Sequence, residues 1–287
     1  MHLATFSVVA CDSQAQAWGI AVASKFPAVG AIVPWAKARA GAVATQSLAN
    51  TTFGPRGLEL MASGLSAEET MAKLLIRDRG REDRQVGLVD AKGNSASFTG
   101  TACSEWAGGL TGPGYAVQGN ILAGADVLGQ MEHAFLEAQG ELPGRLFAAL
   151  DAGSQAGGDR RGRQSAALLV VKQRAGYGGH NDRWVDLRVD DHLNPIGRLG
   201  ELLEMHNLYF GKGPKSQRVR LEGIVVKDLQ EIMKALGYYT ATAGIYDDST
   251  QEAFRLFISN ENFERRANPD QGWIDRPVLE YLMRKLK

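Results

Sequence analysis

Apolar positions in the first two thirds of the chain form short, nearly unbroken runs rather than alternating patterns. Residues 17–23 are apolar at almost every position, and residues 30–35 and 41–46 are similar and rich in Gly and Ala. Strands have this composition when both of their faces are covered. With the run at 5–10 and the polar turn at 11–14, these segments predict an N-terminal hairpin followed by further buried strands.

Helical periodicity begins after these runs. A helix that opens at Pro55 would place Leu58, Met61 and Leu65 on one face, and Ser-Ala-Glu-Glu at 66–69 forms a capping box for a second helix. The later segments predict, in chain order, a hairpin of strands at 85–90 and 95–100, a strand at 115–122, helices at 124–138 and 142–152, strands at 165–171 and 184–189, and a helix at 195–208.

The order of these elements defines the fold class that we expect. Strands and helix pairs follow one another without βαβ alternation, which argues against a doubly wound parallel sheet. Two-sided burial of the strands instead favours an α+β fold over residues 1–208, in which two sheets pack together between helix pairs as a four-layer αββα sandwich. Residues 209–222 are rich in Gly, Pro and charge and are interpreted as a linker. Three helical patterns at 226–236, 249–258 and 276–286 predict a small all-α domain over 223–287.

The composition limits the classes of partner that we expect. The 287 residues carry 32 Lys and Arg against 32 Asp and Glu, so no net field attracts nucleic acid. No apolar run is long enough to span a membrane, and no secretory signal opens the chain. Two cysteines form neither a disulfide framework nor a metal spacing. We therefore expect a cytoplasmic protein without metal or cofactor.

Several familiar catalytic motifs are absent from the sequence. It has no Gly-x-Ser-x-Gly elbow, His-Glu-x-x-His, phosphate loop or clean dinucleotide fingerprint. Its five histidines are scattered. A nucleophile that needs no histidine is therefore of interest.

Thr5, at the head of the first predicted strand, is a candidate for such a nucleophile. An N-terminal threonine can pass its hydroxyl proton to its own α-amine, whose pKa of about 7.7–8.0 suits a base at neutral pH. A nearby cation would keep the amine neutral and stabilise developing charge. Lys37, between the two predicted strands that follow the hairpin, or Lys25, at the end of the second strand, could supply it from a neighbouring strand. The alternative for each lysine is a solvent-facing position at the end of a strand.

Residues 4–208 resemble the bacterial and archaeal family DUF1028, which is similar to the N-terminal-nucleophile (Ntn) hydrolases. The resemblance is carried by segments at 5–10, 22–26, 41–46, 54–58, 117–124 and 158–165. It implies the αββα architecture, in agreement with the pattern of elements. Because the family's function is not established, the resemblance implies a fold more than a substrate.

A wider resemblance to proteasome-type β subunits implies roles for single residues. Thr5 matches the nucleophile, Lys37 falls at a similar distance to the lysine of that pattern, and Asp159 matches its late aspartate. Ser24 or Lys25 stands where the pattern has a second aspartate, which puts its proton network in doubt.

Other polar residues near the same predicted rim are candidates for oxyanion or substrate contacts. For Asn50 in particular, the alternative is hydrogen bonding within a turn. Arg163 belongs to a short basic loop, for which the alternatives are a solvated surface and an anion contact. The candidates are Ser24, Gln46, Ser47, Asn50, Gln118, Asn120 and Arg163.

The C-terminal part has a resemblance of its own, to the small three-helix peptidoglycan-binding-like domain. It implies binding of a peptidoglycan fragment, with a dimer contact or an intramolecular lid as alternatives. The matching residues are 226–230, 236–239, 244–250, Ala253 and Phe254.

Three hypotheses about function follow. The first is an Ntn-type amidohydrolase that cleaves a small amide or peptide bond with Thr5 as nucleophile. A homo-oligomer is possible for it. The second is a binding or assembly protein that retains the fold without chemistry. The third uses Cys103 or Cys11 as the nucleophile, although isolated cysteines without a nearby base are usually small buried residues.

Overall fold

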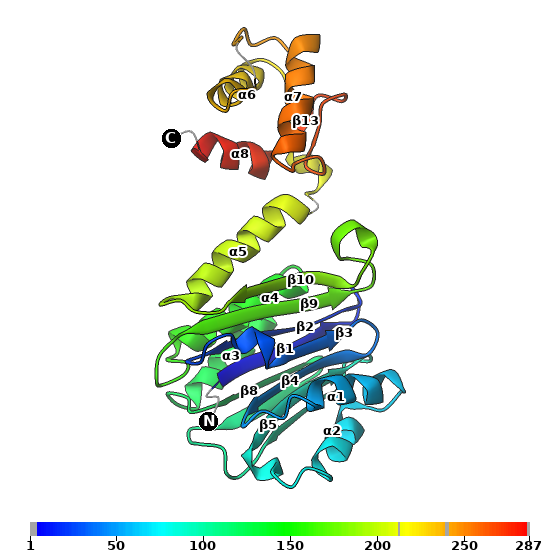
Figure 1. Cartoon of the computed structure of the whole chain (residues 1–287), viewed down its shortest axis with the longest axis vertical. Helices are drawn as coiled ribbons and strands as arrows, with labels where there is room; N and C mark the ends of the chain where they lie inside the picture. The colour runs from blue at the N-terminus through cyan, green and yellow to red at the C-terminus, as the bar shows by residue number, and fades with distance from the viewer. Residues whose placement is uncertain (1–4, 212, 239–240, 286–287) are drawn as a thin grey trace. The chain divides into compact units, whose positions relative to one another are not determined.

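The computed structural model describes residues 5–211, 213–238 and 241–285 (Figure 1). It divides the chain into two compact units, Met1–Leu202 and Leu203–Lys287, which we call the larger and the smaller unit. Both helices and strands are present, so the predicted mixed α/β composition is confirmed. None of the helices in the described ranges has the length and hydropathy needed to span a lipid bilayer.

Two antiparallel sheets form the centre of the larger unit. The six-stranded sheet has the order β10-β9-β2-β1-β8-β7, and the four-stranded sheet has the order β3-β4-β5-β6. The strands of the first are β1 (Thr5–Asp12), β2 (Ala17–Ser24), β7 (Gly108–Gly112), β8 (Tyr115–Asn120), β9 (Ser165–Lys172) and β10 (Arg183–Val189). Those of the second are β3 (Pro34–Lys37), β4 (Gly41–Ser47), β5 (Arg84–Asp90) and β6 (Ser95–Thr99).

One pair of helices packs on the outer side of each sheet. Helices α1 (Phe53–Ala62) and α2 (Ala67–Leu75) contact the four-stranded sheet, whereas α3 (Asp126–Glu137) and α4 (Leu142–Gln155) contact the six-stranded sheet (Figure 1). Helix α5 (Pro195–Phe210) follows. The predicted capping box of α2 is present, because Glu69 N donates to Ser66 Oγ at 3.2 Å and Ser66 N donates to Glu69 Oε2 at 2.8 Å.

Strand alternation decides which side chains enter the space between the two sheets. On β1, even-numbered Phe6 faces the α3–α4 helices, where it lies beside Gly153 and Gly158. The odd-numbered positions therefore face the other sheet. An apolar cluster fills most of this space and includes Val9, Trp18, Ile20, Ala44 and Val89. At one end the apolar residues give way to polar ones, which form the candidate site.

The smaller unit combines three helices with a short antiparallel sheet. The helices are α6 (Ile224–Ala235), α7 (Asp248–Asn260) and α8 (Arg276–Lys285), and the strands β11 (Arg218–Arg220), β12 (Ala267–Asn268) and β13 (Trp273–Asp275) have the order β11-β13-β12. The three helices were predicted, but the all-α interpretation is wrong, and part of the predicted linker is strand β11. Strands of two or three residues are too short to show an alternating pattern.

A buried ion pair stabilises the smaller unit. Arg266 and Asp275 are each 3% exposed, and Arg266 Nε donates to Asp275 Oδ2 at 2.7 Å. Arg266 Nη1 also donates to the carbonyls of Asn207, Leu208 and Gly211 at 2.7, 2.9 and 3.1 Å. The guanidinium therefore caps the C-terminal end of α5, where backbone carbonyls lack the full set of helical partners.

We expect Arg266→Ala to lower the unfolding free energy of the smaller unit by about 3–5 kcal/mol, because it leaves the Asp275 carboxylate buried without its cation. Urea denaturation followed by hydrogen exchange of peptides from 218–285 measures this loss. Arg255→Ala is the matched control. Its side chain is 45% exposed and pairs with Glu252 and Asp270, so a loss of no more than about 1 kcal/mol is expected. Equal losses in both variants would contradict the structural role of Arg266.

Candidate functional site

Strand register brings an uncharged polar layer together at one end of the space between the sheets. Thr5 pairs with Ser24 on one side and with Asn120 on the other, and Ser24 pairs with Ser165. On the facing sheet Gln46 pairs with Gln85. The layer consists of Thr5, Ser7, Ser24, Gln46, Gln85, Gln118, Asn120 and Ser165, all of them buried.

Gln85 is the anchor of the hydrogen-bond network in this layer. Its Nε2 donates to Gly119 O at 2.7 Å, Thr99 Oγ1 at 2.9 Å and Gly108 O at 3.1 Å. Its Oε1 accepts from Gln46 Nε2 and Asn120 Nδ2, both at 2.9 Å. One side chain thus connects the four-stranded sheet to β7 and β8 of the other sheet.

The network continues to the strand that begins with Thr5. Ser7 Oγ donates to Gln46 Oε1 at 2.7 Å and accepts from Gln118 Nε2 at 2.6 Å. Gln46 Nε2 also approaches Thr5 O at 3.3 Å and Gln118 O at 3.4 Å. Ser7 and Gln85 were not among the predicted site residues. A signal was present for Ser7, which lies two residues after Thr5 on the same face of β1, whereas Gln85 lies on β5, a strand without any predicted site residue.

Thr5 itself is fully buried at the head of β1. Its Oγ1 donates to Ser24 Oγ at 3.4 Å, which is longer than a typical hydroxyl hydrogen bond. The structure therefore brings together Thr5, Ser24, Gln46, Gln118 and Asn120 of the predicted set.

The prediction that Lys37 lies beside Thr5 is wrong. Lys37 is an exposed residue that pairs with Gly41, at the opposite end of β4 from Gln46. Gly41 and Gln46 are five residue steps apart along the strand, which is about 17 Å. The position of Lys37 along the sequence did not reveal the direction of β3. The structure supports the alternative interpretation, in which Lys37 faces the solvent.

Lys25 and Asp159 do lie at the polar end, in a loop contact. Lys25 directly follows Ser24 and is exposed, and its backbone N–H donates to Asp159 Oδ2 at 2.9 Å. The buried Asp159 carboxylate also binds Arg161, with Nη2 to Oδ2 at 2.9 Å and Nε to Oδ1 at 3.1 Å. Asp159 therefore fastens its loop to the end of β2, and its charge is balanced by Arg161.

Arg163 and Asn50 have structural contacts away from Thr5. Arg163 Nη2 donates to Ser154 O at 3.4 Å, in the last turn of α4, where a cation is favourable. Asn50 Oδ1 accepts from Thr52 N and Thr52 Oγ1 at 3.2 and 2.7 Å, and Asn50 Nδ2 donates to Asp78. The turn alternative for Asn50 is confirmed.

Ser47 and Cys103 lie at the edge of the polar layer. Ser47 is buried and ends β4 with a φ of 66°, a left-handed conformation that few residues other than glycine adopt. Cys103 Sγ donates to Arg84 O at 3.3 Å, opposite Ser47 in the sheet. Burial raises the pKa of the Cys103 thiol, so it is less reactive than an ordinary cysteine.

Both thiols should resist alkylation in the folded protein. Burial, with Asp90 and Asp12 adding to it, raises the pKa of Cys11 from 9.0 to about 11. A raised thiol pKa leaves little thiolate at pH 8, and the stability linked to it is present below pH 9 and lost as pH rises from 9 to 11. Mass spectrometry after iodoacetamide treatment at pH 8 should show no adduct in native protein and two after unfolding. Rapid native labelling of Cys103 would instead favour the cysteine hypothesis.

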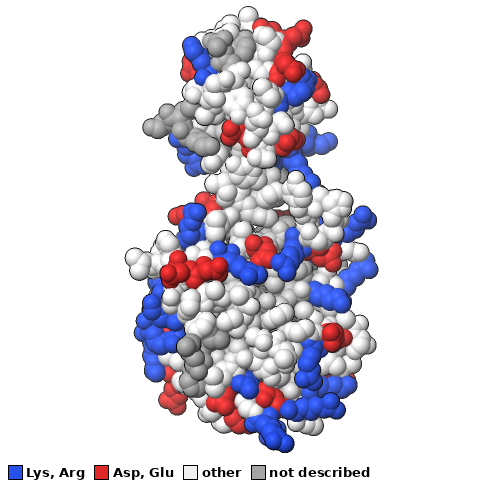
Figure 2. Space-filling model, viewed as in Figure 1, with Lys and Arg blue, Asp and Glu red and all other residues white. Residues whose placement is uncertain are grey.

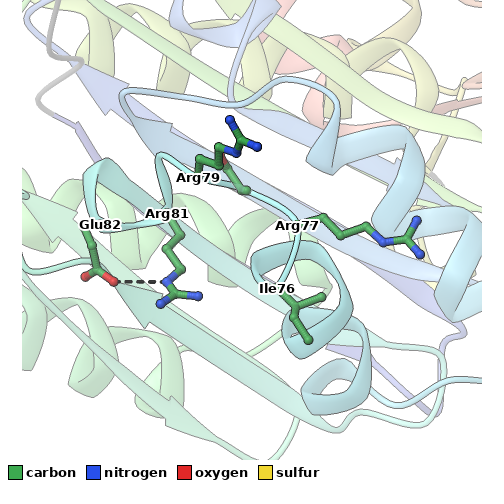
Figure 3. A pocket seen from close by; sticks show the side chains of 6 residues that line it. Ile76, Arg77, Arg79, Arg81 and Glu82 are labelled. Atoms are coloured by element: carbon green, nitrogen blue, oxygen red, sulfur yellow. Dashed lines mark hydrogen bonds and ion pairs between the residues drawn. The ribbon is translucent and has the colours of Figure 1, made fainter.

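A separate surface hollow of about 540 Å³ lies between α2 and β5. Its arginines do not converge, since Arg77 and Arg79 point away from each other in Figure 3. Its carboxylates are engaged, Asp78 by Arg84 at 2.8 Å and Glu82 by Arg81 at 3.2 Å. On the face drawn in Figure 2, Lys and Arg are interspersed with Asp and Glu. In the parts of the chain that the structure describes, no group of His, Cys, Asp and Glu is arranged to hold a metal.

The larger unit is thus a mixed α/β protein in which two facing antiparallel sheets enclose a neutral polar layer beside a buried threonine. Residues 5–199 match the family model described as "Family of unknown function (DUF1028)", and the chain belongs to this family. Residues 209–282 match the family described as "Putative peptidoglycan binding domain".

A solved structure supports the same assignment. The chain is similar to the crystal structure of protein SPO2555 from Silicibacter pomeroyi, a DUF1028 protein, with 32% identity and a TM-score of 0.65. The similarity covers 75% of this chain and 92% of that one. No curated protein matches the chain.

Proposed function

We propose that the larger unit is an N-terminal-nucleophile amidohydrolase with the four-layer αββα architecture, and that it cleaves a small amide or peptide bond. The arrangement of helix pairs outside two facing sheets supports the architecture. The observation that carries the function is the position of Thr5, buried at the head of β1 with its hydroxyl on the inter-sheet face.

In this proposal, removal of residues 1–4 frees the α-amine of Thr5. The amine takes the hydroxyl proton, Oγ1 attacks the amide carbonyl, and the C–N bond breaks as the leaving amine receives the proton. A water molecule, deprotonated by the same α-amine, then hydrolyses the Thr5 ester, which releases the acid and restores the hydroxyl. Backbone N–H groups around Gln46 and Ser47 hold the oxyanion, at the end of β4 where Ser47 has a φ of 66°. Lys25 is the proposed cation, because it directly follows Ser24, which pairs with Thr5 in the sheet.

Intact mass spectrometry of the purified protein tests the first step. The proposal expects a species that begins at Thr5, together with release of ammonia or amine from a panel of small amides. A protein that stably retains Met1 and still hydrolyses amides would contradict the Thr5 mechanism, because the amine of Thr5 would be blocked.

A binding or assembly protein without chemistry is the second candidate for the larger unit. The remote position of Lys37 and the engagement of Asp159 by Arg161 favour it, because the proteasome-type pattern uses both residues. This candidate expects binding of small molecules without turnover across the same panel.

For the smaller unit we propose binding of a peptidoglycan fragment, supported by the family match over 209–282. Co-sedimentation of the full chain with purified peptidoglycan tests it. Sedimentation unaffected by added soluble fragments would contradict specific binding, and chromatography with light scattering measures homo-oligomers in the same preparation.

A further inference from the structure

The directions of the amide hydrogen bonds around Gln85 follow from its main-chain anchors. Gly119 O and Gly108 O can only accept, so the group of Gln85 that faces them must be its NH₂. Gln85 Oε1 then requires donors, which fixes the NH₂ groups of Gln46 and Asn120 toward it. Amide orientations that are otherwise assigned from the surroundings are set here by the backbone.

With the amide orientations fixed in this way, two buried oxygens of the layer are left without donors. Gln46 Oε1 is satisfied by Ser7, and Ser7 Oγ by Gln118 Nε2. Gln118 Oε1 and Asn120 Oδ1 accept from no donor among the residues that the structure describes. Each such buried acceptor costs about 1–3 kcal/mol.

The two oxygens differ in their surroundings. Both are buried, but Gln118 Oε1 packs on the backbone of β5, only 2.2 Å from where a Cβ on Gly87 would stand. Asn120 is the last residue of β8 and the strand partner of Thr5. Directly paired residues of antiparallel strands have Cβ atoms about 4.5–5.5 Å apart, so a group bound at Asn120 would lie beside the Thr5 hydroxyl.

The surrounding chemistry limits what that group can be. Gln46 Nε2 is already engaged by Gln85 Oε1, Thr5 O and Gln118 O, so it is not available to an oxyanion. The side chains of the layer are hydroxyls and amides, so an ion placed among them would lose hydration without gaining a counter-charge from the layer. A neutral N–H donor satisfies both conditions.

We infer that Asn120 is a substrate-binding residue whose Oδ1 accepts the N–H of an uncharged carboxamide, and that the site selects such amides over acids, amines and N,N-disubstituted amides. The inference rests on the proposed function, because it gives a substrate class to the same Thr5 site. It assigns Asn120 to the substrate N–H and leaves the oxyanion to the backbone.

Binding is measured in protein that carries Thr5→Ala and lacks residues 1–4, the form that the proposed function assumes, so that turnover does not interfere. The probes are benzamide, N,N-dimethylbenzamide, benzoate and benzamidine, followed by titration calorimetry and ligand-detected saturation-transfer NMR. Benzamide should bind at least about tenfold more tightly than N,N-dimethylbenzamide, the equivalent of about 1.4 kcal/mol. Asn120→Leu should abolish this preference.

Two further variants keep the test decisive. Asn120→Asp retains the acceptor and adds a charge, so it should shift preference from benzamide to benzamidine, a gain that misfolding cannot produce. Gln164→Leu, a half-buried residue that bonds Asp191, is the matched control and should bind like the parent.

The inference is overturned if no probe binds, if both benzamides bind equally, or if the preference survives in Asn120→Leu. Failure of the proposed function looks different. Asn120-dependent binding of benzamide without hydrolysis by the Thr5 protein would sustain the inference and overturn the hydrolase. Hydrolysis that does not depend on Asn120 would do the reverse.

Discussion

Thr5→Ala should reduce amide hydrolysis by at least about a thousandfold, because it removes the only nucleophilic atom in the proposed mechanism. Ammonia release from the amide that wild-type protein turns over fastest measures the effect. The variant Thr5→Val replaces the hydroxyl by a methyl group and keeps the shape of this buried side chain, and it should be equally inactive. Equal inactivity of the two variants would therefore show that the hydroxyl, and not the shape of the side chain, is required.

The conservative change Thr5→Ser serves as the positive control. It keeps a hydroxyl and an α-amine in the same residue, so measurable turnover should remain. If Thr5→Ala retained wild-type activity, the N-terminal-nucleophile mechanism would be wrong, and a binding function or another nucleophile would have to be considered.

Gln85→Leu should lower the unfolding free energy of the larger unit by about 4 kcal/mol or more. The substitution removes five hydrogen bonds at once, three donated to Gly119 O, Gly108 O and Thr99 Oγ1 and two accepted from Gln46 and Asn120, and each is worth about 0.5–1.5 kcal/mol. Urea denaturation of the full chain, with hydrogen exchange of peptides from β5 and β8, measures the loss.

Gln85→Glu distinguishes hydrogen bonding from packing. It has nearly the same shape but presents oxygens to carbonyls that need donors, so it should destabilise the larger unit about as much as leucine does. Gln164→Leu again provides the control, because only one bond, to Asp191 at 3.1 Å, is removed. A Gln85→Glu protein as stable as wild type would show that the network adds nothing to stability.

Local patterns identified most of the elements of the larger unit. The capping box at Ser66 is a local interaction, which explains why it was predictable. Two-sided burial of β1, β2, β4 and β9 was likewise visible as unbroken apolar composition. In the smaller unit, β11 pairs with β13 across more than fifty residues, and nothing local marks so short a strand.

The sequence by itself determined that two sheets' worth of buried strands alternate with helix pairs, that a small helical region follows, and that Thr5 heads the first strand. Only the tertiary structure decided which polar side chains meet. Register between distant strands placed Asn120 opposite Thr5, brought Gln85 into the layer and left Lys37 at the far end of β4. Register is set by packing both faces of each sheet at once, and a shift of one residue would turn every one of these side chains to the other face.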